Sequence, residues 1–248
     1  ATAVSLADSG KKVLLLSTDP ASNLQDVFDM PLDNKGTPIK DVPRLTVVNL
    51  DPEQAAAEYR ESVIAPYRGK LPESVIANME EQLSGSCTVE VAAFNEFSDF
   101  ITDEDKSKNY DYIIFDTAPT GHTLRMLQLP SAWDTFIDEN TTGASCLGQL
   151  SGLEDRKDVY KHAVKNLTDK SKTTLFLVSR PEDSPLKEVE RSSNELSDIG
   201  IETQHLIING VLENYDADDS ISKQIYEHQQ NALNNRSAAL LKLNTYIV

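Results

Sequence analysis

Three short segments place polar residues directly after apolar runs, where they could serve phosphoryl transfer. The segments are STDP (17–20), DTAP (116–119) and NG (209–210). In an open parallel sheet, ligands bind beyond the carboxyl ends of the strands. Asp19 and Asp116 at neighbouring strand ends could therefore hold a hydrated Mg²⁺ and position a water molecule for attack on a γ-phosphate. Capping of the next helix explains a single aspartate of this kind about as well.

The third polar position, Asn209, carries an amide that can both donate to and accept from a purine edge. The alternative is a turn residue before Gly210, and spacing alone favours the turn. A phosphate-binding loop, G-x-x-x-x-G-K-[ST], would be the usual partner of the aspartates. The chain contains no such pattern: Gly10-Lys11 and Gly69-Lys70 lack both the glycine spacing and the following Ser or Thr.

The elements that must position these residues follow from alternating patterns along the chain. Continuous apolar runs indicate strands buried on both faces, in 13–16, 45–50, 110–119, 173–179 and 204–210. Amphipathic stretches between them indicate helices, in 52–66, 71–83, 89–103, 149–168, 184–199 and 217–234. Strands alternating with helices predict an α/β fold, a doubly wound and mostly parallel sheet with helices on both faces.

We expect a single domain over residues 1–248, with the strand-free stretch 51–103 as a helical insertion within it. Residues 32–44 have the Gly and Pro content of a loop. Ser184-Pro185 is typical of a helix start, with a capping residue followed by proline. The first ten residues indicate the end of a helix that Gly10 stops, so we expect the sequence to begin inside a domain, N-terminally truncated.

Composition narrows the class of protein. The 248 residues include 40 acidic and 23 basic ones, for a formal charge of −17, which disfavours nucleic acid or an anionic membrane surface as partner. The longest apolar run, VLLL, is too short to span a bilayer. Two cysteines provide no disulfide framework, and no leader opens the chain. These features predict an acidic cytoplasmic α/β protein.

Several segments together resemble one family, the arsenical pump-driving ATPases of the deviant P-loop class. The resemblance rests on STDPASNL (17–24), LSGSCTVE (83–90), IIFDTAPTGHTLRMLQLP (113–130) and GASCLGQLSGLE (143–154), and it extends through LIINGVL (206–212). It implies a P-loop NTPase-like fold and ATP hydrolysis with Mg²⁺, which energises efflux of arsenite and antimonite. In that family the phosphate-binding loop would lie just upstream of Ala1. We therefore expect this stretch by itself to hydrolyse no ATP.

The resemblance also implies roles for individual residues. Asp19 matches the first switch, where the aspartate serves Mg²⁺ or the attacking water, and Asp116 opens the second switch, which senses the γ-phosphate. Asn209 matches an asparagine that contacts adenine. The neighbouring switch positions are Thr18, Pro20, Thr117 and Gly121.

Cys87 and Cys146 match the metalloid-binding cysteines of the family, and His122 matches a further ligand, within a helical metalloid-binding subdomain. Trivalent arsenic and antimony are soft centres that favour thiolate ligands. Without the family context both cysteines would be assigned to a buried structural role, because free cysteine is among the most buried residue types.

Partners follow from the resemblance as well. Family pumps commonly contain two homologous halves, and this chain has one copy of each motif. We therefore expect a second homologous half or a homodimer, a membrane arsenite channel subunit beside which the protein is peripherally associated, and a possible metallochaperone. The alternative is a targeting ATPase that delivers tail-anchored membrane proteins. The chain has three Met and no C-x-x-C pair, which disfavours it.

Overall fold

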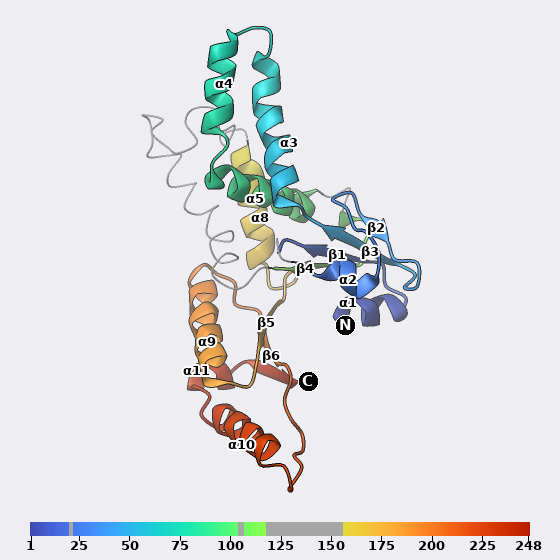
Figure 1. Ribbon diagram of the computed structural model, residues 1–248, viewed down its shortest axis with the longest axis vertical. Coiled ribbons are helices and arrows are strands. Elements are labelled where there is room, and N and C mark those ends of the chain that lie inside the picture. Colours follow the sequence, from blue (N-terminus) through green and yellow to red (C-terminus); the bar gives the residue numbers. More distant parts are fainter. Residues whose placement is uncertain (20–21, 104–106, 118–155) are drawn as a thin grey trace. The chain divides into compact units, whose positions relative to one another are not determined.

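A computed structural model of the chain describes residues 1–19, 22–103, 107–117 and 156–248 (Figure 1). The chain forms two compact units, Ala1–Val164 and Lys165–Val248, and each is described by itself. The first contains α1 (Thr2–Asp8), β1 (Val13–Ser17), α2 (Leu24–Phe28), β2 (Thr37–Pro38), β3 (Leu45–Asn49), α3 (Pro52–Ile64), η1 (Ala65–Tyr67), α4 (Glu73–Gln82), α5 (Ser86–Thr102), β4 (Tyr112–Asp116) and most of α8 (Lys157–Thr168). The second contains β5 (Leu175–Ser179), α9 (Asp183–Asp198), β6 (Gln204–Ile208), α10 (Ser220–Asn234), α11 (Ala238–Leu241) and β7 (Asn244–Ile247).

The sheet of the first unit has the order β2-β3-β1-β4, with β1 paired in parallel to both β3 and β4. All five residues of β1 are buried, as the unbroken apolar run predicted. The two residues of β2 pair antiparallel with β3. They lie within 32–44, where the sequence predicted a loop, because a two-residue strand is too short to produce an apolar pattern.

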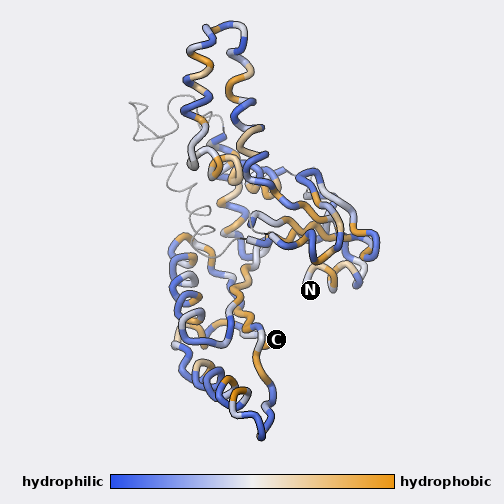
Figure 2. The backbone as a smooth tube through the Cα atoms, viewed as in Figure 1, coloured by the Kyte–Doolittle hydropathy of each residue, from blue (hydrophilic) through white to orange (hydrophobic). Residues whose placement is uncertain are grey.

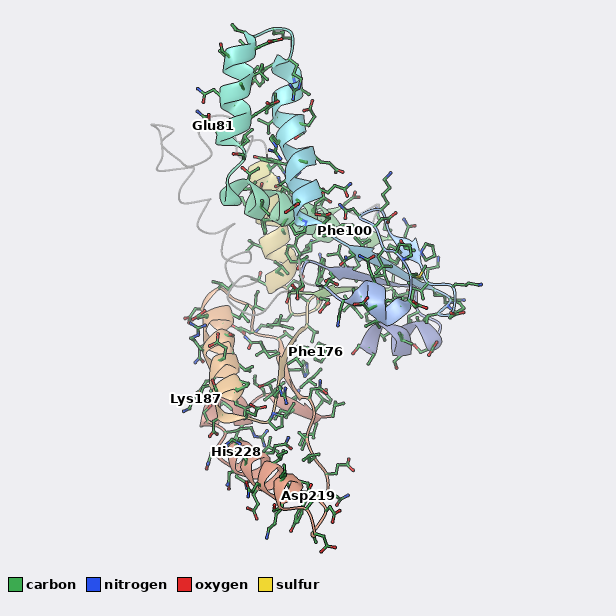
Figure 3. All side chains as sticks on the ribbon, in the orientation of Figure 1. Glu81, Phe100, Phe176, Lys187, Asp219 and His228 are labelled. Atoms are coloured by element: carbon green, nitrogen blue, oxygen red, sulfur yellow. The ribbon has the colours of Figure 1, made fainter. Side chains whose placement is uncertain are left out.

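Alternate residues of β1 face opposite sides of this sheet, and both sides are covered. Val13 and Leu15 pack with Ala3 and Ala7 of α1. Leu14 and Leu16 pack on the other face with Phe100 of α5, which is labelled in Figure 3. Figure 2 shows the strands of this sheet as largely hydrophobic segments. The predicted α/β class, with mostly parallel strands and helices on both faces, is confirmed.

The stretch 51–103 contains α3, η1, α4 and α5, and its description as an insertion stays a prediction. The carboxylate of Asp51 accepts hydrogen bonds from the backbone N–H groups of Glu53 and Gln54, and Pro52 follows at the first helical position of α3. A small apolar cluster joins α3 to α4. Arg68 lies between them and forms ion pairs with both Glu61 and Glu80 at 2.8 Å.

In the second unit, the parallel sheet has the order β5-β6-β7. The sequence did not predict β7, because its residues NTYI mix polar and apolar types. Helix α9 begins at Asp183 after the N-cap residue Glu182, so Ser184 lies in the first turn and is not the cap. Phe176 and Val178 are 47 % and 60 % exposed, so β5 is not buried on both faces as predicted. Leu177, on the opposite face, is buried where α9 contacts β5.

The strands thus occur in two sheets, one in each unit, and the assignment of residues 1–248 to one domain stays a prediction. Among the helices of the described ranges, none is both long enough and apolar enough to cross a membrane.

We expect Leu206→Ala to lower the free energy of unfolding by about 2–5 kcal/mol, because Leu206 is fully buried in the central strand β6. Urea-induced unfolding followed by circular dichroism measures the change. Val178→Ala, on the exposed face of the same sheet, is the matched control and should change stability by less than about 1 kcal/mol. Equal losses in the two variants would contradict the burial of β6.

Candidate functional site

The carboxyl ends of three adjacent strands bring polar residues into one row. The strand register pairs Ser17 of β1 with Asn49 of β3 on one side and with Asp116 of β4 on the other. Residues paired across neighbouring strands point to the same face of a sheet, and adjacent strands lie about 4.8 Å apart. The row of Asn49, Ser17 and Asp116 therefore lies at the end of an apolar layer, which is formed by the residue two positions earlier in each of the three strands.

Ser17 connects the two segments that carry the candidate catalytic aspartates. Its hydroxyl lies 3.4 Å from Oδ2 of Asp116 and donates to it, and its Oγ accepts from the backbone N–H of Asp19 at 3.3 Å. The backbone N–H of Thr18 also donates to the carbonyl oxygen of Asp116, at 2.9 Å. Ser17 and Thr18 are both buried. The two predicted aspartates are therefore brought together, at the sheet edge where the sequence placed them.

Sequence reasoning missed Ser17 and Asn49. Ser17 ends the apolar run directly before Thr18-Asp19, and that position at a strand end was the available signal. Asn49 ends the neighbouring strand, and its Oδ1 is buried without a hydrogen-bond partner in the structure. An orphaned acceptor in the same row as a carboxylate and a hydroxyl is an oxygen that a ligand could engage.

The electrostatics of the row suit a cation. Partial burial raises the pKa of Asp116; the hydrogen bond from Ser17 opposes that rise, and the negative charge of Asp19 adds to it. Both effects that raise the pKa reflect the cost of negative charge at this edge, and a bound cation would relieve it.

The donor set fits Mg²⁺. Among the described residues, no cluster of three or more His, Cys, Asp or Glu side chains could hold a metal ion. Mg²⁺ does not need such a cluster, because it commonly binds one or two carboxylates and completes its shell with water and substrate phosphates. Asp19 and Asp116 are the two carboxylates that could hold it here.

Asn209 belongs to the second unit, where it directly follows the central strand β6. Its backbone N–H donates to the carbonyl oxygen of Ser179 at 2.8 Å, and its side chain is exposed. Gly210 takes the left-handed conformation that the turn requires, with φ of +80°. The left-handed residue of this turn is thus Gly210 and not Asn209. The Asn209 side chain is exposed at the end of β6, where a ligand could reach it.

The predicted metalloid residues are only partly covered by the structure. Cys87 lies in the first turn of α5. Pro20, Gly121, His122 and Cys146 lie outside the described residues, and their roles stay predictions. Thr117 follows β4 and is exposed.

Helix α5, which carries Cys87, is connected to β4 and α8 through aromatic contacts. The ring of Phe97 meets the ring of Phe115 edge-on at 4.7 Å between centroids, and Phe115 directly precedes Asp116. Phe94 packs on Tyr160 of α8 at 5.2 Å, and the Tyr160 hydroxyl donates to Oδ1 of Asn95 at 2.5 Å. The helix of Cys87 is thus in direct contact with the strand of Asp116.

The amino-acid sequence is similar to those of known proteins over nearly its whole length. A family profile described as "Anion-transporting ATPase" matches residues 1–238. The chain belongs to this family. It is 49% identical over 99% of its length to an arsenical pump-driving ATPase of Acidiphilium multivorum, and 48% identical, again over 99%, to one of Escherichia coli. It spans 42% of the length of each of these relatives.

A more distant relative is named ATPase ASNA1 homolog 1, from Paramecium tetraurelia. It is 31% identical over 83% of this chain and 68% of its own length. The family resemblance inferred from the motifs is therefore confirmed, and the similarity is greater to the arsenical pump-driving ATPases.

We expect Asp116→Asn to raise stability against unfolding at pH 7 in the presence of EDTA. A raised pKa means that ionised Asp116 costs folding free energy, a cost that appears as pH rises above the ordinary carboxyl pKa of 3.8. The difference in thermal midpoint between variant and parent should therefore shrink as pH falls through that range. Thermal unfolding at pH 3 to 8 measures it. A variant less stable than the parent at pH 7 would contradict the charge repulsion described here.

Proposed function

We propose that this chain is an ATP-hydrolysing part of an arsenite and antimonite efflux pump, in which metalloid binding is coupled to hydrolysis. The observation that carries the proposal is the pair Asp19 and Asp116 at one sheet edge, in a chain 48–49% identical to proteins named arsenical pump-driving ATPases. Phosphoryl transfer requires positioning and charge neutralisation with little covalent chemistry from the protein, and this edge is suited to both.

In this proposal Asp19 and Asp116 hold Mg²⁺ and orient the attacking water. When bound, Mg²⁺ neutralises charge on the phosphates of ATP. Ser17 keeps the two aspartate segments at a fixed separation, and Asn209 donates to and accepts from the adenine edge. Thr18, Pro20, Thr117 and Gly121 form the switch segments, and a phosphate-binding loop preceding Ala1 completes the nucleotide site.

Metalloid would bind at Cys87 and Cys146, with His122 as a further ligand. The coupling route we infer runs along α5, because the same helix carries Cys87 and packs Phe97 against Phe115, next to Asp116. Two packed elements of this kind can transmit a small displacement at one site to the other.

The partners we propose are a second homologous half or a second copy of the chain, a membrane channel for arsenite, and a metallochaperone that delivers the metalloid. The protein would act in the cytoplasm, peripherally associated with the channel. The relatives named ATPase ASNA1 homolog favour the tail-anchored targeting alternative, but they are only 31–32% identical.

Antimonite should stimulate ATP turnover several-fold in a version of the chain that carries the phosphate-binding loop. Cys87→Ser combined with Cys146→Ser should abolish the stimulation and leave the unstimulated rate within about twofold, because the soft ligands are lost while the carboxylate edge is intact. Steady-state phosphate release with and without antimonite measures both rates. Stimulation that survives the double substitution would exclude the cysteines as the activating site.

Phe97→Leu should reduce antimonite stimulation about threefold to tenfold, since an aromatic pair contributes on the order of 1 kcal/mol beyond its buried area. Phe94→Leu is the matched control: it removes an equally buried phenylalanine one turn earlier on α5, whose ring lies 5.2 Å from that of Tyr160 of α8 and 6.2 Å from that of Phe97. The same phosphate-release assay compares them, with antimonite affinity determined separately. Equal loss of stimulation in the two variants would contradict a route through the contact with β4.

A further inference from the structure

The turn that follows β6 is held by hydrogen bonds from its first residue onward. The N–H of Asn209 donates to the carbonyl oxygen of Ser179, at the end of β5. The next two N–H groups, of Gly210 and Val211, both donate to the carbonyl oxygen of Val248, at 2.8 and 3.2 Å. Ser179 of β5 and Val248, the residue that follows β7, thus accept the first three hydrogen bonds of this turn.

The fourth N–H is bound by a side chain from a different element. Gln229 of α10 accepts from the N–H of Leu212 through Oε1 at 2.8 Å, and its Nε2 donates to the carbonyl oxygen of Gly210 at 3.2 Å. The amide of Gln229 therefore engages the turn as another peptide group would, with one donor and one acceptor. Together the four bound N–H groups leave no free backbone donor between Asn209 and Leu212.

Gln229 is positioned for this contact by its burial. It is 8 % exposed, and it lies on the same side of α10 as the buried Ala232 and Leu233. Helix α10 begins after its capping residue Asp219, and His228 directly precedes Gln229; both are labelled in Figure 3. A buried glutamine is unfavourable unless its amide is paired, and here both ends of the amide are paired within the turn.

The held backbone also governs the side chain of Asn209. That side chain is exposed. The direction of its Cα–Cβ bond is set by the backbone on either side, which hydrogen bonds to Ser179, Val248 and Gln229 hold in place. A backbone held in place before the ligand arrives lowers the entropy cost of binding.

We propose that Gln229 is a positioning residue for Asn209. By holding Gly210 and Leu212, it fixes the direction in which the Asn209 amide meets the purine edge, and so contributes to the selection of adenine over bases with a different edge. The inference rests on the proposed role of Asn209 and adds a determinant from a separate helix.

The test compares ATP with ITP, whose base carries a carbonyl where adenine carries its 6-amino group. We expect Gln229→Met to reduce the ratio of the ITP to the ATP dissociation constant about fivefold, the effect of one misaligned hydrogen bond. Competition binding on the version with the phosphate-binding loop measures the ratio. Gln224→Met is the matched control, because Gln224 is exposed on the same helix; it should leave the ratio unchanged.

Asn209→Ala separates this inference from the role of Asn209 itself. If Gln229→Met alone lowers the ATP preference, Asn209→Ala removes it, and Gln229→Met causes no further loss in the Asn209→Ala background, the two residues act through one contact and the inference stands. If Asn209→Ala removes the preference while Gln229→Met alone retains it, the hydrogen bonds of Gln229 to the turn do not determine the base preference and the inference is overturned. If Asn209→Ala keeps the preference, the proposed role of Asn209 fails and the inference fails with it.

A second variant and a second measurement guard against simple misfolding. Gln229→Glu retains the acceptor for Leu212 and loses the donor to Gly210, so the preference should fall between those of the parent and Gln229→Met. Amide hydrogen exchange at Leu212 should accelerate in Gln229→Met while the buried amides of β6 keep their protection. An unchanged exchange rate at Leu212 would show that Gln229 does not hold this part of the turn, and would overturn the inference.

Discussion

The pairing of β1 with strands on both sides is the constraint on which the rest of the candidate site depends. Because β3 and β4 both run parallel to β1, all three carboxyl ends meet at one edge, and the register places Asn49, Ser17 and Asp116 side by side. Burial of both faces of β1 in apolar contacts makes a slip in this register costly, since a shift of one residue would turn Ser17 into the opposite layer.

That constraint gives the site its electrostatic character. A hydrophobic strand that ends in a buried serine puts the Asp116 carboxylate where water is partly excluded, with a second carboxylate two residues beyond Ser17. Such an arrangement costs folding free energy, and a cation bound there would offset that cost. Helix α5 packs against the opposite side of the same strands.

The two units use different means to hold their candidate binding residues. In the first, the Ser17 side chain connects two strand ends, whereas in the second α10 contributes Gln229 to hold a turn that is also bonded to Ser179 and Val248. In both units a buried polar side chain, Ser17 or Gln229, forms its hydrogen bonds with the carboxylate or backbone group that it positions. Such groups stabilise the fold only while their partners remain in place, which links local structure to function.

The sequence alone determined the α/β class and the strands on either side of β1, and it predicted the sheet edge at which Asp19 and Asp116 lie, because apolar runs and the polar residues that follow them are local patterns. It could not determine that Ser17 bonds Asp116, since the two are 99 positions apart and only strand register brings them together. Nor could it identify Gln229 or β7, whose residues resemble ordinary surface positions until tertiary packing buries the one and pairs the other. Local patterns establish which elements form, while pairings between distant segments decide which side chains meet.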